Sequence, residues 1–323
     1  MLIVTNRNIN QDQFENGTAN EFAFGEQVNA KGPNEIRLAH AKKLKTGPNA
    51  GDWRIQLVKE PNNLTADNLP SRHEFSALRK RLQQAGKNCV FFIHGYNQSF
   101  QKNLEQSLLI EELYDVEVVA FSWPSNTGGF TTREYRDAKR TAQASVAALD
   151  ATLMKLGAYH CGPFDHDHQK DCEVKLSLMA YSLGNFLLQN YVRDALYEND
   201  ANIFANIILC QADVDHPGHQ YWVDAIETGK RIYITINEND WVLKWSDTNF
   251  QKDRLGRTGR GLIAHKPDYY DFTDGPGVES THGLFYADTN DTIKAFFKTV
   301  LNGHRPDNSL ELYYDDINNS WRF

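Results

Sequence analysis

The chain has 323 residues, of which 41% are hydrophobic and 24% are charged, the composition of an ordinary globular protein. The formal net charge of −8 argues against a nucleic-acid partner, because such proteins usually carry clusters of excess Lys and Arg. No apolar run approaches the length that spans a bilayer, so we expect no membrane span.

The first 88 residues are rich in Asn, Gly and Pro. The opening MLIVT is followed by polar sequence and lacks the basic and long apolar regions of a signal peptide, so a cytoplasmic location is expected. Three pieces, LIVTNR, NEIRLAH and DWRIQLV, resemble strands, and residues 72–84 are predicted to form a helix. Because no flexible linker separates this region from Cys89, we expect antiparallel edge strands of the same sheet rather than a separate domain.

From Cys89 onward, short apolar runs alternate with segments of helical period, which is typical of a parallel sheet covered by helices. The predicted strands are CVFFI (89–93), VEVVAFSW (116–123), VKLSLMAYS (174–182), IFANIILC (203–210), KRIYITI (230–236) and a short one over 269–272. The predicted helices are the segment after HGYNQSF, one long helix over 135–156, LGNFLLQNYVRDAL, and a closing helix over 293–301 capped by Asn290 or Asp291. The prediction is a single α/β domain over 1–323, with N-terminal edge strands (1–88), a core (89–303) and a C-terminal tail (304–323).

The four cysteines are few for this length. Cys89 and Cys210 lie in apolar runs that are predicted strands, where cysteine behaves as a small hydrophobic residue. Together with Cys161 and Cys172 they are therefore expected to be reduced thiols rather than disulfides.

The segment AYSLG places Ser182 between a predicted buried strand and a predicted helix. This is a variant of the nucleophile elbow, in which small residues flank a serine held at strained backbone angles. Ala180 stands where the motif usually has its first glycine, and alanine is still small enough for helix and strand to approach. Ser182 is therefore the candidate nucleophile.

A serine hydroxyl needs donors for the oxyanion that forms when it attacks a carbonyl. The chain leaves the strand CVFFI through HGYN, where this kind of fold supplies one backbone N–H, so we assign that donor to Tyr96 or its neighbour Gly95. The residue after the nucleophile, Leu183, is expected to supply the other donor. His94 is interpreted as a structural residue of the loop.

The serine also needs a base, which should be a histidine in the loop before the last helix. His282 in ESTHGLFY meets this condition, whereas His265 lies in a basic Gly-rich loop and His304 follows the helix. For the carboxylate that orients the histidine we favour Asp240, just past the strand IYITI. Asp213 or Asp215, one strand earlier in CQADVDH, is the alternative acid.

Other features carry weaker predictions. Aromatic residues close to predicted strand ends are candidates for lining the substrate pocket, and two or three of five are expected to do so: Trp123, Tyr181, Trp241, Trp245 and Phe285. The polar segment HCGPFDHDHQKDC (160–172) has metal-ligating residue types, but its spacing fits no zinc template, so no metal is expected. The basic loop DRLGRTGRG (253–261) is interpreted as solvated, with an anion-binding role for Arg254, Arg257 or Arg260 as the alternative.

The chain resembles a family of uncharacterised bacterial α/β hydrolases in the following segments, taken in order: FFIHGYNQSF, VVAFSWPS, AYSLGNFLL, IILCQADVD, NENDWVLKWS and THGLFY. The opening LIVTNR is similar to that family's first strand. The resemblance implies the α/β-hydrolase fold and a triad of Ser182, Asp240 and His282. The expected activity is hydrolysis of a carboxylic ester in a small-molecule acyl substrate through an acyl-enzyme, without a cofactor. An amidase, peptidase or thioesterase with the same triad, and a catalytically silent binding scaffold, remain the alternatives.

Overall fold

The structure is a computed structural model that describes residues 1–65, 68–125, 128–129, 131–160, 174–194, 203–286 and 290–323. Within these residues twelve strands form one sheet in the order β13-β14-β12-β11-β10-β9-β7-β8-β1-β5-β6-β3, and two further strands, β2 (Arg7–Ile9) and β4 (Phe24–Val28), form a small second sheet. Eight consecutive strands of the large sheet are parallel, which confirms the predicted α/β class. They are β14 (Ser320–Arg322), β12 (Pro267–Asp271), β11 (Ile232–Ile236), β10 (Asn206–Cys210), β9 (Leu176–Tyr181), β7 (Asn88–Ile93), β8 (Val116–Ser122) and β1 (Leu2–Thr5).

The N-terminal strands extend this sheet, as the sequence predicted, with one difference. β5 (Arg37–Lys43), β6 (Trp53–Leu57) and β3 (Thr18–Ala19) are antiparallel, but β1 pairs parallel with β8 on its other side. All four residues of β1 are buried, so it is a strand of the sheet interior and not an antiparallel edge strand. The predicted C-terminal tail also contributes strands, since β13 (Tyr313–Asp315) and β14 form a hairpin that pairs with β12.

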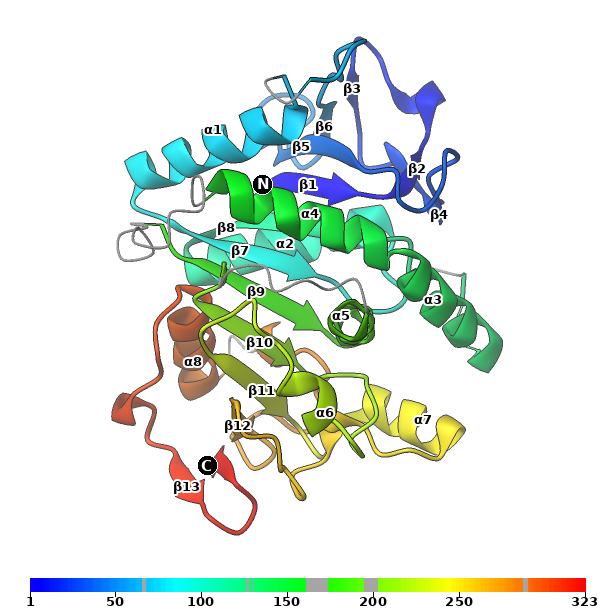
Figure 1. Ribbon diagram of the computed structural model, residues 1–323. Coiled ribbons are helices and arrows are strands. Elements are labelled where there is room, and N and C mark those ends of the chain that lie inside the picture. The colour runs from blue at the N-terminus through cyan, green and yellow to red at the C-terminus, as the bar shows by residue number, and fades with distance from the viewer. Residues whose placement is uncertain (66–67, 126–127, 130, 161–173, 195–202, 287–289) are drawn as a thin grey trace.

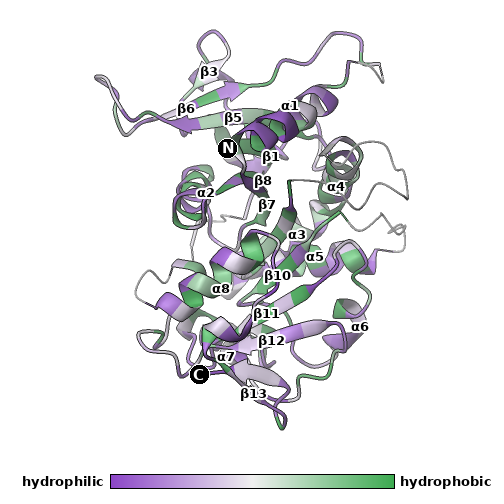
Figure 2. Ribbon diagram, turned by 90° about the vertical axis from the view of Figure 1, so that its left-hand side faces the viewer, coloured by the Kyte–Doolittle hydropathy of each residue, from purple (hydrophilic) through white to green (hydrophobic). Residues whose placement is uncertain are grey.

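Helices cover both faces of the sheet (Figure 1). Figure 2 shows α2 (Phe100–Tyr114) and α8 (Asp291–Leu301) on one side, and α1 (Pro70–Ala85), α3 (Thr132–Ala144), α4 (Val146–His160), α5 (Gly184–Arg193) and α6 (Gln220–Val223) on the other. Alternate residues of each central strand therefore enter two separate apolar cores. Phe91 belongs to the core on the side of α1, α3, α4, α5 and α6, and Phe92 belongs to the core on the side of α2 and α8. The remaining helix, α7 (Trp241–Phe250), follows β11.

The long helix predicted over 135–156 is divided at Ser145 into α3 and α4. The Ser145 hydroxyl donates to the Thr141 carbonyl one turn back and accepts a hydrogen bond from the Asn6 amide. A serine that bonds back to the preceding turn in this way bends a helix, and here it ties the bend to the end of β1.

Cys89 and Cys210 are free and buried, as expected, whereas Cys161 and Cys172 lie outside the described residues. Among the helices that the structure describes, none has both the length and the apolar character needed to cross a membrane.

Candidate active site

Ser182 lies in a sharp turn between β9 and α5, and its φ of 51° is in the left-handed region that non-glycine residues rarely adopt. The turn is held from both sides: the Ser182 N–H donates to the Cys210 carbonyl, and the Ser182 carbonyl accepts from the Asp213 N–H. The buried Asn185 amide also donates to the carbonyls of Ala180 and Ser182. These bonds hold the hydroxyl at the carboxyl end of the sheet despite the backbone strain.

Two glycines allow the elbow to approach the neighbouring strand β7. A Cβ on Gly184 would lie 2.5 Å from the Ile93 carbonyl oxygen and 2.8 Å from that of His94. A Cβ on Gly95 would lie 2.8 Å from the Ser182 Cβ. No side chain fits in either place, so the last glycine of AYSLG and the glycine of HGYN are required by the same close approach.

His282 connects the serine to a carboxylate. Its Nε2 lies 2.9 Å from Ser182 Oγ, and its Nδ1 lies 2.7 Å from Asp240 Oδ2. The other carboxylate oxygen, Oδ1, accepts 3.0 Å hydrogen bonds from the N–H groups of Val242 and Leu243 and so caps α7. Asp240 is fully buried, which its four hydrogen-bonding contacts make tolerable.

The predicted oxyanion donors lie on two loops, the turn between β9 and α5 and the loop after β7. Leu183 directly precedes α5, and the first N–H groups of a helix have no acceptor within the helix. Gly95 touches Ser182, and Tyr96 lines the cavity above it. The backbone of this loop is fixed from below by the buried Arg7, whose Nη2 donates to the Gln98 carbonyl at 2.8 Å.

His94 contacts Gly95 and Trp123 rather than Ser182, Asp240 or His282, and these contacts support the loop from inside. Its ring stacks on Trp123 at a centroid distance of 5.5 Å, its Nε2 accepts from the Trp123 N–H, and its Nδ1 bonds the Gly95 carbonyl. Burial, aided by the nearby Arg7, lowers the pKa of His94 to about 3, so the ring is neutral near neutral pH.

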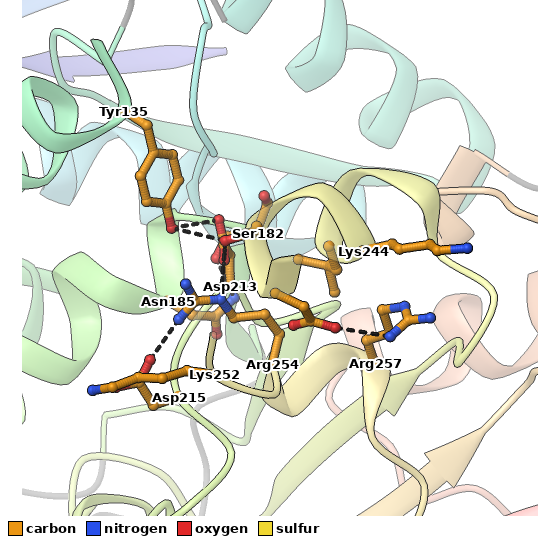
Figure 3. A network of polar contacts seen from close by, with 12 residues as sticks. Tyr135, Ser182, Asn185, Asp213, Asp215, Lys244, Lys252, Arg254 and Arg257 are labelled. Atoms are coloured by element: carbon orange, nitrogen blue, oxygen red, sulfur yellow. Dashed lines mark hydrogen bonds and ion pairs between the residues drawn. The ribbon is translucent and has the colours of Figure 1, made fainter. Parts of the chain in front are cut away.

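The alternative acids belong to a different network, shown in Figure 3. Asp213 accepts from the Tyr135 hydroxyl at 2.8 Å and the Ser246 hydroxyl at 2.9 Å, and its Oδ1 lies 3.3 Å from Arg254 Nε. Asp215 pairs with Arg254 and with Lys252. Arg254 is almost fully buried, and the pKa of Tyr135 is raised well above its usual value by burial and by the Asp213 charge. Both carboxylates are thus engaged by Arg254, and His282 contacts Asp240 instead.

A cavity of about 190 Å³ opens over Ser182 and His282. Two of the five predicted aromatic residues, Tyr181 and Trp245, line it. Trp123 and Phe285 are fully buried in the two cores, and Trp241 is 57% exposed at the start of α7; none of these three is among the lining residues. The other lining side chains are largely polar: Tyr96, Asn97, Gln98, Lys102, Tyr135, Asp213, Val242 and Ser246.

Comparison with models of known protein families identifies the family of the chain. Residues 71–261, more than half of the chain, match an α/β hydrolase family of unknown function, DUF900. The chain belongs to this family. Searches of curated proteins and of solved structures gave no match.

The part of this α/β hydrolase that matches the family contains Ser182 and Asp240 and ends at Gly261, so His282 lies beyond it. The segment that carries His282 is attached by residues that the sequence reasoning did not single out. The Asn237 amide donates to the carbonyls of Glu279 and Thr281, and the Gln211 side chain bonds Thr281, Leu284 and Asp240. The only sequence signal for either residue was its position directly after a buried strand.

The remaining weak predictions concern metal and anion binding. Among the described residues of the hydrolase, no group of three or more His, Cys, Asp or Glu side chains is arranged to hold a metal ion, and the segment 161–172 lies outside these residues. In the basic loop Arg254 pairs with Asp213 and Asp215, and Arg257 pairs with Asp247. Those two arginine charges are therefore already compensated within the protein, and Arg260 is exposed.

Proposed function

We propose that this α/β hydrolase is a serine hydrolase that cleaves a carboxylic ester, with Ser182 as nucleophile, His282 as general base and Asp240 as the carboxylate that orients the histidine. One observation carries the proposal, the continuous hydrogen-bonded chain from Ser182 Oγ through His282 to Asp240 Oδ2, with links of 2.9 and 2.7 Å. Nucleophile, base and orienting acid within such distances form the arrangement that activates a serine.

In the proposed mechanism, Ser182 attacks the ester carbonyl while His282 Nε2 takes its proton. The N–H groups of Leu183 and of Tyr96 or Gly95 stabilise the oxyanion, a contribution worth roughly 3 kcal/mol for each well-placed donor. His282 then gives its proton to the departing alcohol, leaving an acyl-enzyme on Ser182. A water molecule, deprotonated by His282, hydrolyses this intermediate and releases the carboxylic acid and the free serine. Asp240 fixes the orientation of the ring and stabilises the imidazolium.

The cavity supports a small, polar acyl substrate. Its volume of about 190 Å³ is modest, and most of its lining side chains carry a hydroxyl, amide or charged group. α7 contributes Val242, Trp245 and Ser246 to the wall, so the segment after Asp240 folds over the site. Between β10 and β11 the described helix is the four-residue α6, which is too short to build a lid.

Two alternatives lead to different experimental results. An amidase, peptidase or thioesterase would use the same three residues on another acyl bond. A silent scaffold, by contrast, would bind a ligand without activating Ser182.

A fluorophosphonate probe tests the proposal, because it phosphonylates only an activated serine. Intact-mass analysis should show one added probe on the wild type and none on Ser182→Ala, while the two proteins unfold at similar temperatures. Absence of labelling in the folded wild type, or labelling that persists in Ser182→Ala, would contradict the proposal. Turnover of p-nitrophenyl acetate beside matched anilide and thioester substrates would then assign the bond.

A further inference from the structure

Gln211 has an unusual backbone for a residue with a long side chain. It directly follows β10, and its φ of 40° lies in the left-handed region, a conformation that costs a non-glycine residue free energy. The backbone there is tightly enclosed, since a Cβ on Gly256 would lie 2.3 Å from the Gln211 carbonyl carbon. Glycine would adopt this conformation without strain, so the presence of glutamine indicates that its side chain is needed.

The fully buried side chain of Gln211 makes three hydrogen bonds, which use both N–H donors and the carbonyl oxygen of its amide. Its Nε2 donates to Asp240 Oδ2 at 2.6 Å and to the Thr281 carbonyl at 2.9 Å, and its Oε1 accepts from the Leu284 N–H at 2.7 Å. The partners fix the orientation of the amide, because a carbonyl only accepts and a backbone N–H only donates. A glutamate of the same shape would instead direct a carboxylate oxygen at the Asp240 carboxylate and at a carbonyl.

These bonds involve both halves of the acid–base pair. Asp240 Oδ2 is the oxygen that faces His282 Nδ1, and Thr281 and Leu284 flank His282 closely on either side along the chain. One amide therefore restrains the carboxylate and both ends of the short histidine segment at once. Asn237 adds a second donor to the Thr281 carbonyl, and its own backbone carbonyl accepts from the Asp240 N–H. Among the described residues, however, the Asn237 side chain bonds the carbonyls of Glu279 and Thr281 and not the Asp240 carboxylate.

We propose that Gln211 is a positioning residue for the triad: it sets the distance and alignment between Asp240 and His282, and it shares the negative charge of Oδ2 with the imidazole. The inference rests on the proposed function. Loss of the amide leaves Oδ2 with His282 as its main partner, which favours the imidazolium and holds the ring less precisely. The neutral ring that accepts the Ser182 proton then predominates only at higher pH.

The titratable side chains of Cys210 and Tyr181, close to Gln211, do not affect the pH profile of Ser182 labelling in the neutral range. Burial raises the pKa of the adjacent Cys210 thiol to about 12 and that of the Tyr181 hydroxyl well above its usual value. Neither group changes charge in the neutral range. A change in the pH dependence of Ser182 reactivity between about pH 5 and 8 therefore reports on the Asp240–His282 pair.

The experiment measures the rate of fluorophosphonate labelling of Ser182 against pH, which needs no knowledge of the natural substrate. In Gln211→Met the maximal rate should fall by about 10- to 100-fold, the cost of misaligning a catalytic group. The acid limb of the profile should move to higher pH, and it should move further in Gln211→Glu, which adds a negative charge. With p-nitrophenyl acetate, kcat should fall and KM should change little.

Asn206→Leu is the matched control. Asn206 is a buried amide at the other end of β10, donating to the Val300 and His304 carbonyls and accepting from Arg231, so its loss removes comparable bonds far from the triad. It should destabilise the protein without moving the pH profile. An unshifted profile in both Gln211 variants, with rates that fall no more than in the control, would overturn the inference. If the wild type is not labelled at all, the proposed function fails instead.

Discussion

Acid should destabilise this protein through His94, a residue outside the proposed triad. The ring is fully buried, and its Nε2 accepts a 3.2 Å hydrogen bond from the Trp123 N–H. Protonation would turn that acceptor into a second donor facing an N–H group, in a site where burial already lowers the pKa of His94 to about 3. In the unfolded chain a histidine takes up its proton near pH 6.5.

The free energy of unfolding changes with pH wherever the folded and unfolded states bind different numbers of protons. Between about pH 6.5 and 3 only the unfolded state binds a proton at His94. The effect of His94 is therefore to leave the free energy of unfolding at its full value above about pH 6.5 and to lower it as the pH falls. Each pH unit in this window corresponds to roughly 1.4 kcal/mol. At about pH 4.5, two units below the unfolded pKa, His94 should have removed about 3 kcal/mol from the free energy of unfolding.

Urea unfolding of the wild type and of His94→Gln at about pH 7.5 and 4.5 tests this prediction. The variant keeps an amide that can meet part of the hydrogen bonding but has no proton to bind, so it should be less stable at the higher pH. The difference in free energy of unfolding between the variant and the wild type should shrink by about 3 kcal/mol at the lower pH, because the other titrating groups are common to both proteins. A difference that stays constant with pH would refute the reasoning.

Four further predictions concern the elbow, the buried ion pair and the cavity. Gly184→Ala should lower the free energy of unfolding by about 1–3 kcal/mol in calorimetry, because its Cβ would collide with two backbone carbonyls; unchanged stability would contradict the close approach. Arg254→Met should cost about 3–5 kcal/mol in urea unfolding by leaving Asp213 buried without its cation, and adding Asp213→Asn should recover part of this; equal single and double losses would contradict the pairing. Lys102 is the one charged side chain of the described cavity lining without an ion-pair partner, since Asp213 pairs with Arg254 and His282 with Asp240. Lys102→Gln should therefore lower kcat/KM by about 3- to 10-fold at low salt for an ester with a carboxylate on its acyl group, and little for its neutral isostere. Activity on p-nitrophenyl esters should fall as the acyl chain grows past a few carbons, and a maximum on long chains would show a larger site than the cavity described.

Much of the fold could be predicted from the sequence because its signals are local. Apolar runs and helical periods located the parallel strands and their helices, and the change of period at Ser182 marked the strand–turn–helix that the structure contains. The order of serine, acid and histidine along the chain selected the candidates. The pairing of β1 and of the C-terminal hairpin was not predictable in this way, since short strands carry no signal of which neighbour they join.

The choice among the acidic residues was decided only by the tertiary structure. Asp213 and Asp240 both follow buried strands, and their local sequences do not separate them. Arg254, about forty residues after Asp213 in the chain, engages Asp213, while the Gln211 amide and the N-terminus of α7 converge on Asp240 beside His282. A carboxylate's partners are set by which distant segments pack against it. Sequence spacing therefore placed both residues at the carboxyl end of the sheet, and only the packing determined which of them meets the histidine.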